Sequence, residues 1–245
     1  MASSDIGTLN ENDLHAALKR WYARPGDQAE VPVEGFVVDI VRGDLLVEIQ
    51  TRSFPAIRRK LSHLLRHHRV RLVYPVAAEK WIVRLAPDGA SRLSRRRSSK
   101  RGAVEEVFAE LVSFPRLLGD PNFSLEVLFI REEEVRRFAG RPAWRRRGWV
   151  THERRLLEVV GQRTFETPAA FAALVPRGLS EPFTTAELAA ALGRPRRLAG
   201  QMAYCLREMG AIAAVGKRGN AVLYSRRAPP PRRGVTILGA EPLPP

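Results

Sequence analysis

The chain has 245 residues, and its 41 lysines and arginines outnumber its 26 aspartates and glutamates, so its formal net charge is +15 at pH 7. This length fits one large domain or two smaller ones, and a hydrophobic fraction of 44% excludes a chain that is disordered throughout. The single cysteine, Cys205, excludes an internal disulfide framework and a cysteine-rich zinc cluster.

The composition also bears on localisation and on partners. The sequence holds no apolar run of the roughly 18–20 residues that span a bilayer, and its first residues lack the basic start and apolar core of a secretory signal. We therefore expect a soluble, cytoplasmic protein with no membrane contact. The excess of positive charge favours a polyanionic partner, most often DNA or RNA. The alternative is that the many arginines reflect genome composition.

The first elements are a helix and a hairpin. The spacing of apolar residues predicts a helix over residues 12–22. Two runs rich in β-branched residues, 35–41 and 45–49, predict strands. Between them, Gly43 and Asp44 suit a two-residue turn, because glycine accepts the positive φ at its first position. The sequence therefore predicts a tight antiparallel hairpin.

The rest of the front part continues this mixture. The patterns predict two more helices, over 53–67 and 104–112, and three strands, over 70–76, 80–85 and 125–130. The polar and basic residues 87–102 predict a mobile loop. The resulting order, α-β-β-α-β-β-α-β, is typical of a mixed α/β sandwich.

The second half predicts a different organisation. Residues 136–150 are rich in arginine and tryptophan, and they either contact phosphate or form a solvated linker. From Thr151 the pattern becomes helical. Residues 228–245 are rich in proline, which predicts disorder. We therefore divide the chain into a first domain (1–135), a basic linker (136–150), a second domain (151–227) and a tail (228–245).

The hairpin places two carboxylates opposite each other. A two-residue turn at 43–44 pairs Asp39 with Glu48 on one face, and Gln50 follows on the same face. Like charges in this arrangement destabilise a sheet, and a divalent cation between them would remove the repulsion. A register shifted by one residue would place the two carboxylates on opposite faces and leave one of them in solvent.

The stretch from Val38 to Gln50 resembles the core motif of the PD-(D/E)XK nuclease superfamily, in which an Asp ends one strand and Glu-x-Lys follows on the next. The resemblance implies a restriction-endonuclease-like α/β core in which Asp39, Glu48 and the Ile49 carbonyl bind Mg²⁺ or Mn²⁺. Gln50 stands where the superfamily usually has lysine. Some members add a glutamate from the first helix, and Glu11 is the candidate here, with Glu34 behind it.

Basic residues follow the motif on the next predicted helix. Arg58, Arg59 and Lys60 would contact phosphates near the site, or they form an ordinary charged helix face. Lys60 lies closest to the apolar stripe and can point toward the two carboxylates. His63 and His67 have the spacing of zinc ligands on a helix, but the sequence offers no third ligand nearby, so we expect no zinc site.

The second domain resembles a winged helix. Thr184 and Glu187 fit a capping box at the start of a helix over 185–192, and a short turn leads to a basic helix after Pro195. Two strands, 211–215 and 221–225, would form the wing. This resemblance implies contacts to DNA from the helix and the wing, through Arg196, Arg197, Gln201, Tyr204, Lys217 and Arg218. The alternative is a winged helix that binds protein.

The sequence thus predicts a magnesium-dependent DNA endonuclease, with a restriction-endonuclease-like mixed-sheet core followed by a winged-helix domain of helices with a short β wing. Double-stranded DNA is the expected partner, and superfamily members often act as dimers, which allows a homodimer here. RNA is an alternative substrate. The alternative function is a non-catalytic DNA-binding protein or regulator on a degenerate nuclease scaffold, which the replacement of lysine by Gln50 favours.

Overall fold

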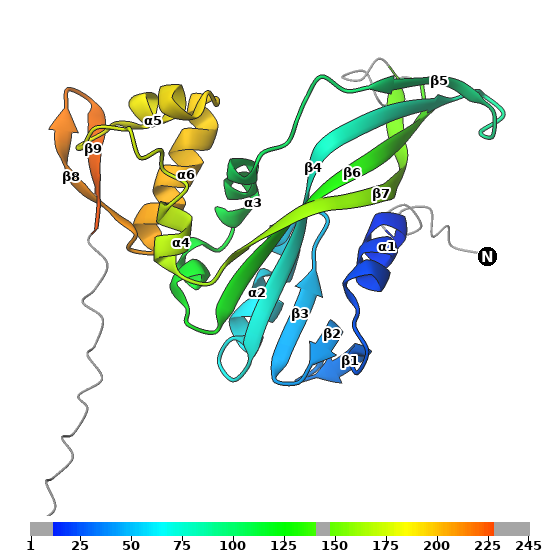
Figure 1. Ribbon diagram of the computed structural model, residues 1–245, viewed down its shortest axis with the longest axis horizontal. Helices are drawn as coiled ribbons and strands as arrows, with labels where there is room; N and C mark the ends of the chain where they lie inside the picture. Colours follow the sequence, from blue (N-terminus) through cyan, green and yellow to red (C-terminus); the bar gives the residue numbers. More distant parts are fainter. Residues whose placement is uncertain (1–11, 141–147, 228–245) are drawn as a thin grey trace, which may run out of the picture.

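A computed structural model describes residues 12–140 and 148–227 of the chain. The candidate Glu11 and the proline-rich residues 228–245 therefore lie outside the described residues. The described part is a mixed α/β structure in which helices cover both faces of a seven-stranded sheet (Figure 1). The predicted mixed α/β class is therefore confirmed.

The sheet begins with an antiparallel meander and continues with a parallel strand. Strands β1 (Gln28–Val33), β2 (Phe36–Arg42) and β3 (Leu45–Ile49) pair in chain order as antiparallel neighbours. Helix α2 (Phe54–Leu64) then crosses over, and β4 (Arg69–Leu85) lies parallel to β3. The predicted hairpin strands are confirmed, and β1 is an additional strand.

The second half of the sheet consists of long strands. Strand β6 (Phe123–Phe138) lies parallel to β4, and β7 (Trp149–Phe165) runs antiparallel to β6. The strand order is β1-β2-β3-β4-β6-β7, and β5 (Arg92–Arg97) pairs with the far end of β4.

Three predictions about this region are wrong. The segments 70–76 and 80–85 are one strand, β4, and the expected loop 87–102 contains β5. The helical pattern expected from Thr151 is replaced by β7. The expected linker 136–150 lies partly in β6 and β7 and partly in residues 141–147, outside the described residues. Pairing with distant strands decides strand identity here, and local patterns do not reveal such pairing.

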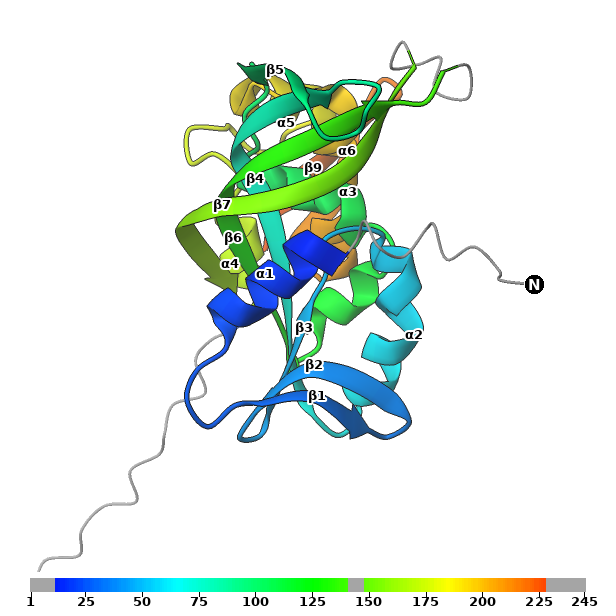
Figure 2. The same ribbon diagram turned by 90° about the vertical axis from the view of Figure 1, so that its right-hand side faces the viewer.

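Two helices cover opposite faces of the meander. Helix α1 (Asn12–Tyr22), which the apolar spacing predicts, buries Leu14, Leu18 and Tyr22 against Ile40 and other residues of β2, β3, β4 and β6. Helix α2 buries Phe54, Leu61 and Leu64 on the other face. Figure 1 shows the two helices on opposite sides of β3, and Figure 2 shows α1 lying across the face toward the viewer.

Short helical turns connect β5 to β6. The predicted helix over 104–112 is a 3₁₀ turn, η1 (Val104–Val107), followed by a single turn of α-helix, α3 (Phe108–Leu111). A second 3₁₀ turn, η2 (Pro115–Gly119), precedes β6.

The C-terminal part holds three helices and a two-stranded sheet. Helix α4 (Pro168–Ala172) follows β7, and helices α5 (Thr185–Leu192) and α6 (Arg196–Glu208) precede the hairpin of β8 (Ile212–Arg218) and β9 (Ala221–Arg226). The capping box that starts α5 is confirmed, because the Thr184 side chain and the Glu187 side chain each bond the other residue's backbone N–H. The elements predicted over 185–225 are therefore present.

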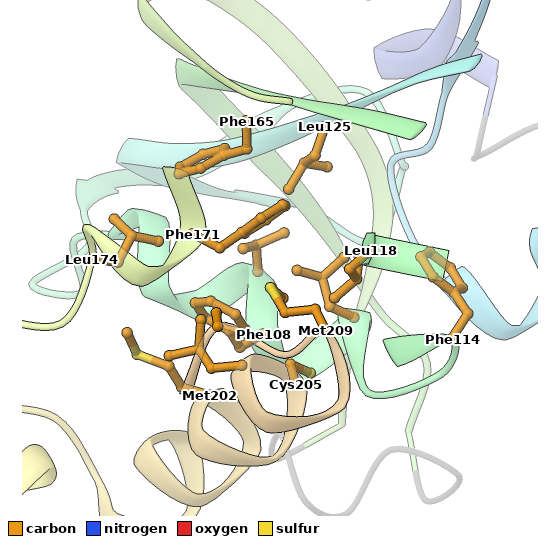
Figure 3. Close-up of a cluster of buried hydrophobic side chains, with 14 of the residues drawn as sticks. Phe108, Phe114, Leu118, Leu125, Phe165, Phe171, Leu174, Met202, Cys205 and Met209 are labelled. Carbon is orange, nitrogen blue, oxygen red and sulfur yellow. The ribbon is translucent and has the colours of Figure 1, made fainter. Parts of the chain in front are cut away.

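One hydrophobic core joins these C-terminal elements to the sheet. Figure 3 shows Phe165 and Leu125 of the sheet beside Phe171 of α4 and Phe108 of α3, with Met202 and Cys205 of α6 close below. The same buried cluster extends to Val38 and Leu46 beneath α2. Burial raises the pKa of Cys205 to about 12, which fits its predicted place in the core. No helix in residues 12–140 or 148–227 is long and apolar enough to cross a membrane.

A buried ionic network lies under the long strands. Glu132 is fully buried between Lys80 (2.8 Å) and Arg154 (2.6 Å), and Glu134 pairs with Lys80 (3.0 Å) and Arg136 (2.8 Å). Burial alone would raise the pKa of Glu134, but the hydrogen bond from Arg136 and the charge of Lys80 lower it to about 2. The folded protein therefore holds this carboxylate ionised.

This network predicts a pH-dependent stability. The pKa of Glu134 is lower in the folded than in the unfolded chain, so its contribution is present above about pH 4.5 and is lost as the pH falls toward about 2. Glu134→Gln should lower the free energy of unfolding by about 3 kcal/mol at neutral pH. Denaturant unfolding at several pH values should show this difference shrinking in acid. A difference that is constant between pH 7 and pH 2 would contradict the role of the Glu134 charge.

Candidate functional site

The hairpin has the predicted register. Arg42 lies opposite Leu45, Val41 opposite Leu46, and Ile40 opposite Val47. Gly43 takes φ 57° at the first position of the turn, which is the conformation that favoured glycine there. The next residues along the two strands are Asp39 and Glu48, and the alternative register, shifted by one residue, is excluded.

Asp39 and Glu48 lie close together where β2 and β3 end their pairing. The Asp39 carboxylate accepts a hydrogen bond from the Ile49 backbone N–H at 2.8 Å, in the gap between the two strands. The Asp39 backbone in turn hydrogen-bonds to the Glu48 carboxylate, and the negative charge of Asp39 acts on Glu48. The side chains of Asp39 and Glu48 are 17% and 7% exposed, so solvent screens their repulsion only weakly.

A cation from each flanking helix meets one of the carboxylates. Nε2 of His15, on α1, lies 3.1 Å from the Asp39 carboxylate. From the other face, Lys60 on α2 forms an ion pair with Glu48 and donates to the Val37 carbonyl at 2.5 Å. The site is thus built from both faces of the sheet, by helices whose apolar stripes fix their orientation on it.

The two carboxyl groups have different proton affinities. Burial is the largest effect on Glu48, and with the charge of Asp39 it raises the pKa of Glu48 to about 7 against the opposing effect of Lys60. Burial would also raise the pKa of Asp39, but the hydrogen bond and charge of His15 and the Ile49 N–H together lower it. The hydrogen bond to Asp39 is likewise the main reason that the pKa of His15 is raised.

The two remaining motif residues, Ile49 and Gln50, differ in whether they can contribute to the site of the two carboxylates. The Gln50 N–H bonds to the Val73 carbonyl in β4, so the Ile49 peptide groups face the opposite edge, toward β2 and Asp39. The Ile49 carbonyl is therefore available near the carboxylates. The Gln50 side chain instead donates to the backbone carbonyls of Arg52 and Ser53. Gln50 thus holds the loop before α2.

The oxygen atoms of this site suit a hard divalent cation that retains several of its water ligands. Two carboxylates and a backbone carbonyl are oxygen ligands of the kind that Mg²⁺ uses together with substrate phosphate oxygens. The buried Glu48 Oε1 is the atom that pairs with the Lys60 ammonium group, so a cation bound there would share this oxygen with Lys60. No cluster of three or more His, Cys, Asp or Glu side chains suitable for a metal occurs among residues 12–140 and 148–227.

The other candidates near α2 lie apart from the two carboxylates. Arg58 and Arg59 are exposed on the outer face of the helix. Glu34, which sequence analysis placed behind Glu11, pairs with His63 at 3.0 Å and His68 at 3.1 Å. His63 is therefore occupied by a carboxylate partner.

The predicted DNA-contacting residues of the C-terminal part are at the surface. Arg196, Arg197 and Tyr204 are exposed on α6, and Gln201 is half-buried. Lys217 and Arg218 are exposed at the end of β8, where Arg218 also pairs with Glu187 at 2.7 Å. The opposite face of α6 is buried as predicted, through Leu198, Met202, Cys205, Leu206 and Met209.

Sequence reasoning missed His15 and left the role of Lys60 open. Both residues come from helices distant in sequence from the residues they contact, and a hairpin pattern contains no information on helix orientation. A signal was available for His15, because it lies one residue after the buried Leu14 and three before the buried Leu18, next to the face that packs on the sheet.

Comparisons with known proteins define a family but no activity. The family described as "Domain of unknown function (DUF8091)" matches residues 12–166, from the start of α1 to the residue after β7. An uncharacterized protein of Treponema pallidum (strain Nichols) is 32% identical over 236 residues, which cover 92% of each chain. No solved structure matches. The chain therefore belongs to the DUF8091 family.

Proposed function

We propose that this protein is a metal-dependent nuclease that hydrolyses phosphodiester bonds in DNA. The observation that carries the proposal is the closeness of Asp39 and Glu48, one residue past the last pair of β2 and β3, between His15 and Lys60. Burying two adjacent carboxylates costs stability, and a cation with a phosphate ligand gives them a function. The order of α1, the β1–β3 meander, α2 and β4 also supports the resemblance to the PD-(D/E)XK superfamily.

The residues of the site have distinct roles in this chemistry. Asp39, Glu48 and the Ile49 carbonyl would hold Mg²⁺ or Mn²⁺. When bound, such an ion activates water and neutralises charge on the phosphate. Lys60 supplies the ammonium group that Gln50 does not, and places it beside Glu48 to stabilise the negative charge that develops on the phosphate. His15 positions the Asp39 carboxylate.

The C-terminal part would hold the DNA. Helices α5 and α6 with the β8–β9 hairpin have the order of a winged helix, and the exposed basic residues of α6 and β8 are suited to phosphate contacts. Such a protein would work in the cytoplasm, alone or as a homodimer.

A non-catalytic DNA-binding protein is the second candidate. The observation that favours it is the Gln50 side chain, which bonds to the loop at Arg52 and Ser53. The two functions differ in one measurement. A nuclease should cut plasmid, linear or branched DNA with Mg²⁺ or Mn²⁺ and stop when the metal is chelated. Binding of the same DNA without metal-dependent cleavage would reject the nuclease, and parallel assays with RNA would identify the substrate.

Two matched substitutions on α2 test the role of Lys60 in the cleavage assay. Lys60→Ala should lower cleavage by at least about 10²-fold, because it removes a charge that stabilises the transition state. Arg59→Ala removes the neighbouring positive charge from the exposed face of the same helix and should leave cleavage near the wild-type rate. Equal rates for the two variants, both folded by thermal melting, would show that Lys60 only balances the charge of Glu48.

A further inference from the structure

The arginine-rich segment before η1 is a strand with two different faces. All residues of β5 are exposed, and the strand pairs antiparallel with β4, with Trp81 opposite Arg97, Ile82 opposite Arg96 and Arg84 opposite Ser94. Directly opposed residues share a face of a sheet, and successive residues alternate. Arg95 and Arg97 therefore lie on the face of Trp81, whereas Arg96 lies on the face of Ile82 and Arg84. Arg92 pairs with Leu85, beyond a register shift between Arg84 and Leu85.

The face of Trp81 is neutralised within the protein. Arg95 pairs with Glu133 at 2.6 Å and Arg97 with Glu79 at 2.5 Å. Both guanidinium groups also lie over the Trp81 ring, at 5.1 and 5.8 Å from its centre. These two arginines have partners that explain them structurally.

Three other arginines at this end of the sheet have no carboxylate partner among the described residues. These are Arg84 of β4 and Arg92 and Arg96 of β5, and we call these three residues the arm face. Within residues 12–140 and 148–227, no acidic side chain pairs with any of them. Arg84 stacks over the Trp149 ring at 4.8 Å, and its Nε is buried and has no hydrogen-bond partner among the described groups. Three like charges on one short stretch of sheet repel each other, so an external anion would stabilise them.

A polar surface of paired charges continues from the arm face toward α6. Lys80, Ile82 and Arg84 are every second residue of β4 and therefore share one face of the strand. Lys80 also lines a cavity of about 330 Å³, together with Lys100, Arg136, Arg154, Glu132 and Glu134. A cleft of about 680 Å³ shares Tyr74, Lys100 and Glu106 with this cavity, and Arg194, Arg197 and Gln201 of the α6 region line its other side. The arm face and the predicted DNA-contacting side of α6 thus border one continuous polar surface.

We propose that the arm face is a second nucleic-acid contact, at which Arg84, Arg92 and Arg96 bind the phosphate backbone of a DNA duplex that also touches the start of α6. The inference rests on the proposed function for its choice of DNA as the polyanion, and it adds a binding surface outside the Asp39–Glu48 site. Figure 1 shows β5 at the upper end of the long strands, well separated from β2 and from the β8–β9 hairpin. Contacts to phosphate supply affinity independent of base sequence.

The test uses the full chain and a labelled DNA duplex, with divalent cations chelated, so that it measures binding without cleavage. Fluorescence anisotropy over a range of salt concentrations gives the dissociation constant and its salt slope. Arg92→Gln with Arg96→Gln should weaken binding and reduce the salt slope by roughly 1.8, because each phosphate contact contributes about 0.9. Two duplexes of unrelated sequence should lose affinity equally.

Three matched variants keep the test decisive. Arg20→Gln with Arg24→Gln removes the same charge from exposed positions at and just after the end of α1 and should leave the slope unchanged. Arg95→Gln with Arg97→Gln removes it from the two β5 arginines that pair with Glu133 and Glu79, and it should also keep the slope. Arg92→Lys with Arg96→Lys retains the charge and should retain most of the slope. Thermal melting confirms that each variant is folded.

Two outcomes would overturn the proposal. If the Arg92 and Arg96 variant has the slope of the Arg20 and Arg24 variant, the arm face does not contact DNA. If it loses affinity for vesicles of anionic phospholipid while its affinity for the duplex is unchanged, the surface serves a membrane. Neither outcome bears on hydrolysis at Asp39 and Glu48, since cleavage is measured separately with the metal present.

Discussion

Asp39→Asn should reduce metal-dependent DNA cleavage by about 10³-fold or more, whereas Asp44→Asn should leave it unchanged. Asp39 lies in the gap between β2 and β3 and contacts His15 and the Ile49 N–H. Its negative charge would hold the cation, whose contribution of several kcal/mol corresponds to about three powers of ten in rate. The asparagine keeps an oxygen that can accept the Ile49 N–H, so the hairpin should remain intact.

Asp44 is a suitable control because it is the same residue type in the same hairpin. It lies in the exposed turn, where its side chain is 76% exposed and pairs only weakly with Arg69 at 3.3 Å. Cleavage rates and Mn²⁺ affinity, measured for both variants, separate the site from the hairpin as a whole. Metal-dependent cutting that survives Asp39→Asn would refute the assignment of the site, and equal loss in Asp44→Asn would point to a folding effect.

Phe171→Ala should destabilise the whole protein by about 3–5 kcal/mol and leave a single unfolding transition. Phe171 on α4 stacks on Phe165 of β7, with ring centres 4.8 Å apart, and meets Phe108 of α3 at 6.3 Å (Figure 3). It is fully buried in the cluster that joins the sheet to α6. Since this cluster is continuous, we expect the C-terminal helices and the sheet to unfold together.

Phe138→Ala is the matched control for this prediction. Phe138 is 61% exposed at the end of β6, so its removal should cost less than about 1 kcal/mol. Denaturant unfolding followed by both fluorescence and circular dichroism gives the free energies and the number of transitions. Two separate transitions in the wild-type protein would contradict a shared core and would support two independent domains.

The sequence by itself determined the local elements and the carboxylate pair. Apolar spacing located α1, the capping box located α5, and the β-branched runs on either side of Gly43 located β2 and β3 with their register. These features depend on neighbouring residues and on backbone preferences, which a local pattern contains. The closeness of Asp39 and Glu48 could be predicted for the same reason, because a two-residue turn leaves one register, although the pairing of β2 and β3 stops one residue before them.

Only the tertiary structure decided the partners of those carboxylates and the extent of the sheet. His15 and Lys60 reach the site because α1 and α2 pack on opposite faces, and Gln50 is drawn away by the loop before α2. Strands β5 and β7 exist because β4 and β6 pair with them along their length. Such contacts join residues far apart in the chain, and their stability comes from burial and pairing that no local pattern of residues specifies.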